Sequence, residues 1–258
     1  MNLDLSGKVA IIGGASQGIG YGIARQLATE GASVVITARR MPDLEAAAEK
    51  LRTESGAEVL PIAADCRRSE DCQRVVDTVR ERFGRLDVLV NNDGAPPLGP
   101  IDSFDDVAWQ KAIEQNLMYV VRMARASLPL LRPHGGSILN ITAISAIQPI
   151  PTFGLSVASW AAVIGFAKTL SLEVAAHNIN VNTICPGYVQ TQRLQKVFAA
   201  DGKDPDKMRQ DLTNEVPMKR LGTVEDISAI VALLVSERGR YITGTSIPVD
   251  GGLLRGIR

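Results

Sequence analysis

Three glycines near the amino terminus have the type and spacing of a phosphate-binding turn. Gly14, Gly18 and Gly20 follow a short apolar run, Val9 to Ile12, and open a helical pattern. Glycine allows a sharp turn and lets a phosphate approach the backbone, while free N–H groups at the start of the helix attract the anion. The spacing therefore predicts a dinucleotide site, although a glycine trio alone also fits an ordinary strand-to-helix turn.

Further candidate residues follow later strand-like runs. Arg39 ends the second run, and the next acid is Asp43. An acid at this place binds the ribose hydroxyls of NAD, whereas a base accommodates the 2′-phosphate of NADP, so NADP is predicted over NAD. The alternative is that Arg39 and Arg40 are ordinary solvated side chains at the start of a loop and bind no cofactor. Asp65 is expected to accept a hydrogen bond from the adenine amino group, or else to be only a capping aspartate. Asn91 is expected to join neighbouring strands through its side chain, or else to be only a turn asparagine. The full set of predicted cofactor-binding residues is Gly14, Ser16, Gln17, Gly18, Ile19, Gly20, Arg39, Asp65, Cys66, Asn91, Gly94, Pro186, Gly187, Val189 and Thr191.

The elements that must position these residues alternate between apolar strand-like runs and helical patterns, as in βαβ units on a parallel sheet. Right-handed crossovers place helices on both faces of such a sheet and ligands at the carboxyl ends of its strands. We expect one α/β domain over residues 1–258, with a charged flap at about 186–215. Strands are predicted at 9–12, 33–37, 59–63, 86–90, 137–141, 180–184 and 246–249, and helices at 19–30, 42–54, 69–83, 107–131, 153–176 and 224–235.

Composition narrows the function classes. Lys plus Arg and Asp plus Glu number 28 each in 258 residues, so no basic excess indicates nucleic acid. The three cysteines fit neither a disulfide framework nor a zinc site, so no metal is expected. The first residues lack the pattern of a signal peptide, and we expect a cytoplasmic protein.

One uncharged stretch bears on membrane association. Residues 135–167 contain no Asp, Glu, Lys or Arg. Pro149, Pro151 and Gly154 interrupt this stretch, so we expect no single apolar helix of spanning length and no membrane partner.

Over nearly its whole length the chain resembles the short-chain dehydrogenases/reductases. Beyond the glycine turn, the matching motifs are Asn91-Asn92-Asp93-Gly94, Asn116, Gly136 to Ile141, Ala158-Ser159-x-Ala161-Ala162-Val163, Pro186 to Thr191, Tyr241 to Gly244 and Val249 to Gly252. The resemblance implies a single-domain Rossmann fold with a doubly wound, seven-stranded parallel sheet in the order 3-2-1-4-5-6-7. It also implies a nicotinamide cofactor, and dimers or tetramers built partly on two long helices.

The family's chemistry, as the resemblance implies it, uses a tyrosine as general acid/base, a lysine four residues later and a serine thirteen residues before. No Tyr-x-x-x-Lys occurs in this chain. Alignment places Ser156 at the tyrosine position, Trp160 at the lysine position and Ala143 at the serine position, while Asn116 is retained. A serine without an adjacent base is a poor proton donor, and Tyr188 is the best stand-in.

Two further departures touch the predicted cofactor site. Gly13 replaces a usual threonine, and Asp93 replaces an alanine in the Asn-Asn-Ala-Gly loop. A carboxylate near phosphates weakens binding, since like charges about 4 Å apart repel by roughly 1 to 4 kcal/mol. Dinucleotide binding is therefore expected to be weak or lost, unless Asp93 points away, for instance into space freed at Gly13.

We expect from these departures a pseudoenzyme with no catalytic residues, which serves as a structural or regulatory subunit. Its expected partner is an active relative, such as the dehydrogenase acting on a hydroxyacyl-CoA in heterotetrameric family members. One alternative is an NAD(P)-dependent oxidoreductase acting on a hydroxyl or carbonyl group, with Ser156, Tyr188 or bound water as proton donor. The other is a non-catalytic dinucleotide sensor. A homo-oligomer and a hetero-oligomer both remain open.

Overall fold

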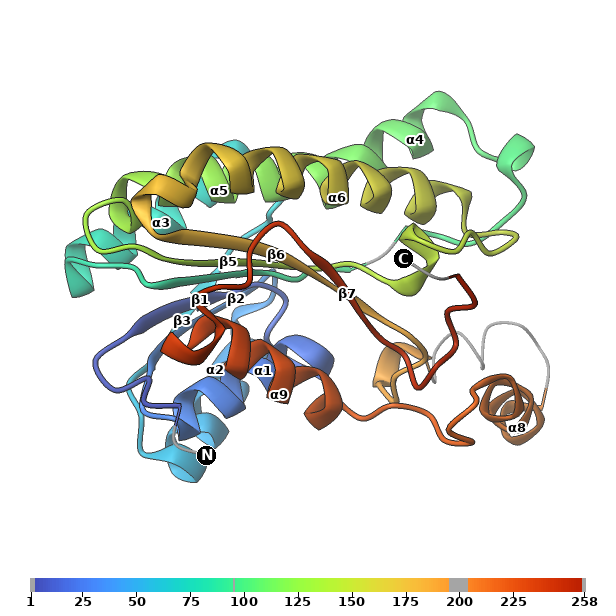
Figure 1. The fold of residues 1–258 in the computed structure, drawn as a ribbon, viewed down its shortest axis with the longest axis horizontal. Coiled ribbons are helices and arrows are strands. Elements are labelled where there is room, and N and C mark those ends of the chain that lie inside the picture. Colours follow the sequence, from blue (N-terminus) through green and yellow to red (C-terminus); the bar gives the residue numbers. More distant parts are fainter. Residues whose placement is uncertain (1–2, 95, 195–203, 257–258) are drawn as a thin grey trace.

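A seven-stranded parallel sheet forms the centre of the computed structural model, which describes residues 3–94, 96–194 and 204–256 (Figure 1). The strand order β3-β2-β1-β4-β5-β6-β7 confirms the prediction. The central strands are almost continuously apolar because helices cover both of their faces. The strands are β1 (Val9–Ile12), β2 (Ser33–Ala38), β3 (Val59–Ala63), β4 (Val88–Asn91), β5 (Gly136–Ile141), β6 (Ile179–Pro186) and β7 (Ser246–Val249).

Two layers of helices sandwich the sheet. In Figure 1, α1, α2 and α9 lie below it, and α3, α5 and α6 lie above it. This arrangement follows from right-handed crossovers that change direction at β1, so the carboxyl edge of the sheet is left open between the layers. The helices are α1 (Gly18–Thr29), α2 (Met41–Ser55), α3 (Ser69–Phe83), α4 (Asp106–Ile113), α5 (Tyr119–Leu131), α6 (Gly154–Val174), α8 (Pro205–Glu215) and α9 (Val224–Val235).

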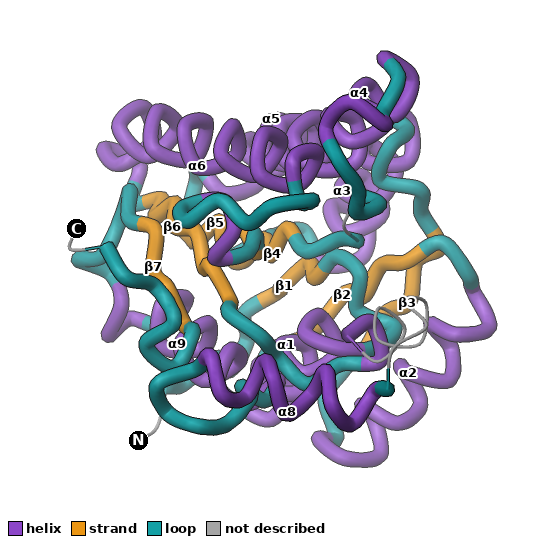
Figure 2. The backbone as a smooth tube through the Cα atoms, turned by 90° about the vertical axis from the view of Figure 1, so that its right-hand side faces the viewer, coloured by secondary structure: helices purple, strands orange, loops and turns teal. Residues whose placement is uncertain are grey.

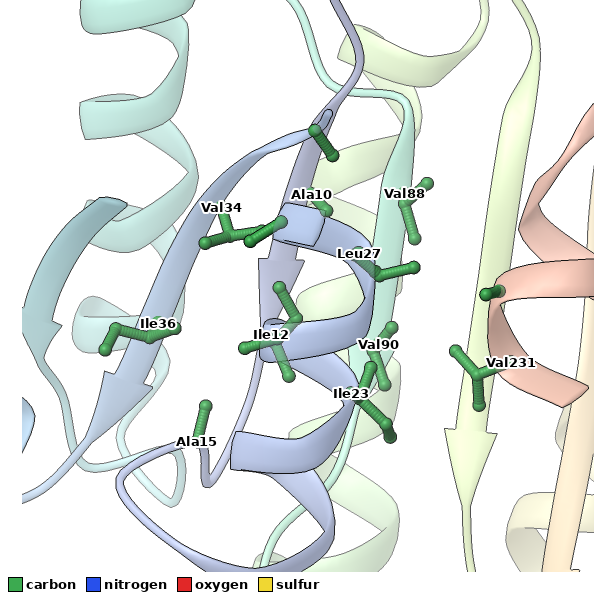
Figure 3. Close-up of a cluster of buried hydrophobic side chains, with 14 of the residues drawn as sticks. Ala10, Ile12, Ala15, Ile23, Leu27, Val34, Ile36, Val88, Val90 and Val231 are labelled. Carbon is green, nitrogen blue, oxygen red and sulfur yellow. The ribbon is translucent and has the colours of Figure 1, made fainter. Parts of the chain in front are cut away.

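The core on the α1 side holds the first strand and helix together. Ile12 and Val90, from neighbouring strands, point toward Ile23 and Leu27 of α1, and Val231 of α9 lies beside them (Figure 3). These five side chains are fully buried. This packing fixes where α1 begins, and hence where its free N–H groups point.

Two segments differ from the predicted elements. The helix predicted at 107–131 is divided by a π-helical turn, Glu114–Met118, into α4 and α5. The flap predicted at 186–215 contains the helix α8, which starts at a proline and has Asp204 as a side-chain cap. Residues 195–203 of that flap lie outside the described residues.

Helix α6 corrects the expectation that no apolar helix of spanning length forms. The helical segment Gly154–His177 has 24 residues and a hydropathy of 1.4, which by length and composition suffices to cross a membrane; this is the single such helix within the described residues. Pro149 and Pro151 precede the helix rather than interrupt it. One face of α6 packs on the sheet, and 39% of its most apolar window is buried.

Asp87 joins the amino ends of the two central strands, opposite the open edge. Its carboxylate accepts a hydrogen bond from the Val9 amide at 2.9 Å and is paired with Arg85 at 2.7 Å and Lys8 at 3.5 Å. Burial by itself raises the pKa of Asp87, but the hydrogen bonds from Arg85 and Val9 outweigh it, and the pKa lies below its ordinary value.

We predict that Asp87→Asn lowers the free energy of unfolding at pH 7 by about 1–3 kcal/mol, since a partly buried ion pair is broken. Because the native pKa is lowered, the carboxylate stabilises the fold fully above about pH 4 and loses this effect as pH falls through the native pKa. Urea unfolding should therefore show a difference between the two proteins that shrinks from pH 7 to about pH 3. The exposed Asp102→Asn is the control, and an equal Asp87→Asn effect at both pH values would contradict the assignment.

Candidate functional site

The turn between β1 and α1 has the backbone shape of an anion site. Gly14 and Gly18 adopt left-handed φ angles of +56° and +62°. A Cβ on Gly14 would lie 2.8 Å from the Asn92 carbonyl oxygen, and one on Gly20 would lie 2.5 Å from the Gly14 carbonyl oxygen. The residue that precedes α1, Gln17, makes no side-chain cap within the described structure, and the first turn carries no acid. The backbone N–H groups in the first turn of α1 are thus available to a phosphate.

Two asparagines at the end of β4 tie this turn to the neighbouring strands. The Asn92 amide donates to the carbonyl oxygens of Gly13 at 3.0 Å and Gly14 at 3.5 Å. The Asn91 amide donates to Asn140 Oδ1 at 2.9 Å, which joins β4 to β5. These contacts hold the carboxyl ends of three strands at one level.

The space beside Gly13 is filled by a residue that sequence reasoning did not select. A Cβ on Gly13 would overlap the hydroxyl oxygen of Tyr119, a buried residue in the first turn of α5. Asp93 does not enter this space: it accepts from the Cys66 thiol and, at 2.6 Å, from the Gly94 amide. Burial and then the Asp93 charge raise the pKa of Cys66. The sequence feature that could have predicted this contact is the combination of a small residue at position 13 with a large residue at position 119.

Arg39 and Asp65 stand beyond the glycine turn, at the ends of β2 and β3. Arg39 is exposed. The Asp65 carboxylate is held by Arg67, with Nε to Oδ1 at 2.9 Å and Nη2 to Oδ2 at 2.6 Å. This hydrogen bonding lowers the pKa of Asp65, and the nearby Arg39 charge adds to the effect. An adenine amino group at this place therefore competes with Arg67 for the carboxylate.

The loop after β6 lies near the glycine turn. A Cβ on Gly18 would be 3.8 Å from the Thr191 methyl group. The Gly187 amide donates to Val249 of β7 at 3.0 Å, and Val189 forms a parallel bridge with Gly222. The predicted residues Pro186, Gly187, Val189 and Thr191 are thus brought to the same edge as Gly14, Ser16, Gln17, Gly18, Ile19 and Gly20.

The Tyr188 side chain is turned toward α8. Its hydroxyl donates to Glu215 Oε2 of α8 at 3.2 Å. Burial, followed by the Glu215 charge, raises the pKa of Tyr188 to about 12. The phenol is therefore neutral at physiological pH and engaged with a carboxylate.

Asn116 and Trp160 meet between α5 and α6, at the π-helical turn. In the amide orientation that satisfies all neighbours, Asn116 accepts from Ser159 Oγ at 2.8 Å and from Trp160 Nε1 at 3.3 Å, and it donates to the Gly94 carbonyl at 3.3 Å. The cavity that these residues border has a volume of about 10 Å³, which is the scale of one water molecule. The indole thus fills this part of the edge.

Ala143 and Ser156 lie in two segments that follow β5 in the chain. Ala143 directly precedes the short helical turn Ile144–Ala146, and Ser156 is buried in the first turn of α6. The Ser145 hydroxyl is also buried and has no hydrogen-bond partner among the described residues. The side chains here are neutral hydroxyls and apolar groups.

We predict that Gly13→Ala destabilises the chain by about 1–3 kcal/mol, because the added methyl overlaps the Tyr119 hydroxyl. Tyr119→Phe in the same chain should recover at least about 0.5 kcal/mol, as measured by a double-mutant cycle in urea. The matched control is Gly256→Ala, where a Cβ meets nothing within 4 Å and stability should not fall. Strictly additive effects of the two changes would show that the hydroxyl does not fill this space.

Comparison with known proteins identifies relatives along the full chain. The model of the family described as enoyl-(acyl carrier protein) reductase matches residues 14–254. The human dehydrogenase/reductase SDR family member 4 is 34% identical over 250 residues, which covers 96% of this chain and 88% of the relative. The 3-oxoacyl-(acyl-carrier-protein) reductase FabG of Staphylococcus epidermidis is 33% identical over 248 residues, with 95% and 98% covered.

Solved structures agree with these matches. The L-sorbose reductase of Gluconobacter frateurii, in complex with NADPH and L-sorbose, has a TM-score of 0.94 and 37% identity, with both chains covered completely. The NADPH-dependent reductase YwfH, of bacilysin biosynthesis, has a TM-score of 0.93 and 30% identity, with 97% of this chain and 99% of that chain covered.

These relatives correct the expectation of a non-catalytic partner subunit. The matched proteins are named as reductases and dehydrogenases, so the prediction of a pseudoenzyme is wrong. It rested on the side chains at positions 143, 156 and 160 alone. The matches span the chain from its glycine turn to its last strand, and the chain belongs to the short-chain dehydrogenase/reductase family.

Proposed function

We propose that this protein is an NADP(H)-dependent reductase that transfers hydride to a polarised double bond. The observation that carries the proposal is the pairing of an uncapped α1 N-terminus with the exposed Arg39 at the end of the adjacent strand β2. A diphosphate is favoured at the first place and a 2′-phosphate at the second. The NADPH named for the sorbose reductase complex and for YwfH supports this choice of cofactor.

The residues present fit a dinucleotide. The left-handed Gly14 and Gly18 leave no side chain between the α1 amides and the open edge. Asp93, which would oppose phosphates, is held instead by Cys66 and the Gly94 amide. A Cβ on Gly18 would lie 3.8 Å from the Thr191 methyl group, so Thr191 borders this turn. When bound, the cofactor supplies a hydride from its nicotinamide ring, and this chain supplies the orientation and the exclusion of water.

We also propose that the protein assembles into an oligomer through α5 and α6. The outer side of α6 leaves Leu172 73% exposed, and the exposed positions Ala158, Ala161 and Gly165 are small enough for another helix to approach closely. Small residues allow helices to pack tightly over a large area. Sedimentation of the purified chain tests this, with Leu172→Glu expected to shift the population toward monomer.

We predict that NADPH binds more tightly than NADH, and that Arg39→Ala weakens NADPH by about tenfold, since one charged hydrogen bond to a phosphate is lost. NADH binding should stay within about twofold, because it has no 2′-phosphate. Isothermal titration of both cofactors measures the effect. Arg40→Ala is the matched control, because Arg40 is paired with Asp43 at 3.2 Å. Tighter binding of NADH by the unmodified protein would refute the choice of cofactor.

We predict that Tyr188→Phe lowers the turnover number by less than about threefold, since the Tyr188 hydroxyl is already engaged with Glu215. Loss of a general acid typically costs about 10²–10⁴ in rate, so the two roles are well separated. NADPH oxidation with a panel of carbonyl and imine acceptors measures the effect. A drop of about a hundredfold would instead make Tyr188 the proton donor.

A further inference from the structure

The end of β3 is joined to the glycine turn through the end of β2. The Ala15 amide, inside the turn, donates to the Thr37 carbonyl of β2 at 3.1 Å, and the Ala64 amide donates to the Ala38 carbonyl at 2.8 Å. Figure 2 faces the carboxyl ends of the strands and shows β2 and β3 on one side of β1, with β4 to β7 on the other. A dinucleotide with its diphosphate at the turn therefore extends its purine and the adjoining ribose toward β2 and β3.

Asp65, the second residue after β3, is already paired with Arg67. The Arg67 guanidinium donates from Nε to Oδ1 at 2.9 Å and from Nη2 to Oδ2 at 2.6 Å, and the Arg67 backbone amide donates to Oδ1 at 3.1 Å. A bidentate pair of this kind is stronger and better oriented than a single contact. Because this hydrogen bonding lowers the pKa of Asp65, the carboxylate is ionised at neutral pH and keeps its attraction for the guanidinium.

The backbone on both sides of this pair is held in place. The Asp65 amide donates to Asp71 Oδ2 at 2.9 Å, and the Arg67 carbonyl accepts from Arg122 Nη1 at 2.8 Å. The Arg122 side chain is only 15% exposed and is paired with Glu114 at 2.6 Å. A cofactor therefore meets the carboxylate and the guanidinium together, as one preformed corner of the site.

This corner offers mainly hydrogen-bond donors. A guanidinium has five N–H groups, and the contacts to the Asp65 carboxylate use two of them, so three remain. Within the pair, Oδ1 accepts two hydrogen bonds and Oδ2 accepts one, so Oδ2 keeps one acceptor position. An aspartate without the arginine would offer acceptors alone. Arg67 thus changes the chemistry that a purine meets here.

Two purines differ in the group that would face this corner. Adenine carries an amino group at C6, which donates, whereas hypoxanthine carries an oxygen at C6, which accepts. A lone carboxylate favours adenine, because with hypoxanthine two acceptors would face each other and one would lose its partner. The pair can satisfy either base, since Arg67 donates to an oxygen and Oδ2 of Asp65 accepts from an amino group.

We infer that Arg67 determines the base specificity of this site, and that the site binds a dinucleotide phosphate with hypoxanthine in place of adenine as readily as the adenine form. This inference rests on the proposed function. Asp65 then acts as the partner that orients Arg67 and as one acceptor, and it does not select the amino group by itself. The 2′-phosphate is bound by Arg39, whose charge also acts on Asp65.

The test is isothermal titration of the full-length protein with NADP⁺ and with nicotinamide hypoxanthine dinucleotide phosphate, which differ only in the purine. We expect the two dissociation constants to lie within about threefold of one another, because the corner has a partner for either group. A hypoxanthine form that binds more than about threefold more weakly would overturn the inference, since the amino group would then be the feature that is recognised.

A pair of variants assigns the effect to Arg67. Arg67→Ala leaves the Asp65 carboxylate without the guanidinium and should create a preference of about tenfold for the adenine form. The matched control is Arg68→Ala, which removes the same charge from the next exposed residue and keeps the bidentate pair, so the two forms should still bind within about threefold. No preference in Arg67→Ala, or an equal preference in Arg68→Ala, would show that Arg67 does not select the base.

The titrations separate this inference from the proposed function. If neither dinucleotide binds, the proposed function fails, and the inference fails with it. If NADP⁺ binds and the unmodified protein clearly prefers it to the hypoxanthine form, the proposed function stands and only the role of Arg67 is wrong.

Discussion

The close approach of the turn after β1 to the loop after β4 is the constraint on which the rest of the site depends. Backbone atoms of Gly14 and Asn92 lie so near to one another that a single methyl group would not fit. The buried side chains of β1, β4 and α1 hold the two loops at this distance. The hydrogen bond from the Asn92 side-chain amide to the Gly13 carbonyl joins them directly. Because the turn cannot open, the α1 amides remain aimed at the carboxyl edge.

The same approach explains why several unusual residues occur together. A glycine at position 13 leaves space, and the Tyr119 hydroxyl takes it. Asp93 then has to point elsewhere and is satisfied by Cys66 and its own neighbouring amide. Each substitution looks unfavourable alone, but together they give a closely packed arrangement in which the carboxylate is hydrogen-bonded.

Charge is distributed unevenly along the edge. Arginines and an aspartate occupy the ends of β2 and β3, while residues 141–145 after β5 and 154–160 at the start of α6 are uncharged. The phosphate-bearing half of a cofactor gains from the first environment.

The sequence by itself determined the alternation of strands and helices and the glycine turn, because buried parallel strands and positive-φ turns restrict residue types directly. The strand order was predicted from the resemblance to the short-chain dehydrogenases/reductases, and the structure confirms it. It also located Arg39, Asn91 and Asn116 at their strand or helix positions. Only the tertiary structure decided how side chains from distant segments pair: Tyr119 with Gly13, Cys66 with Asp93, Trp160 with Asn116 and Tyr188 with Glu215. Such pairs are set by distances across the fold that no local pattern encodes, and for this reason three side chains at positions 143, 156 and 160 could not settle the function.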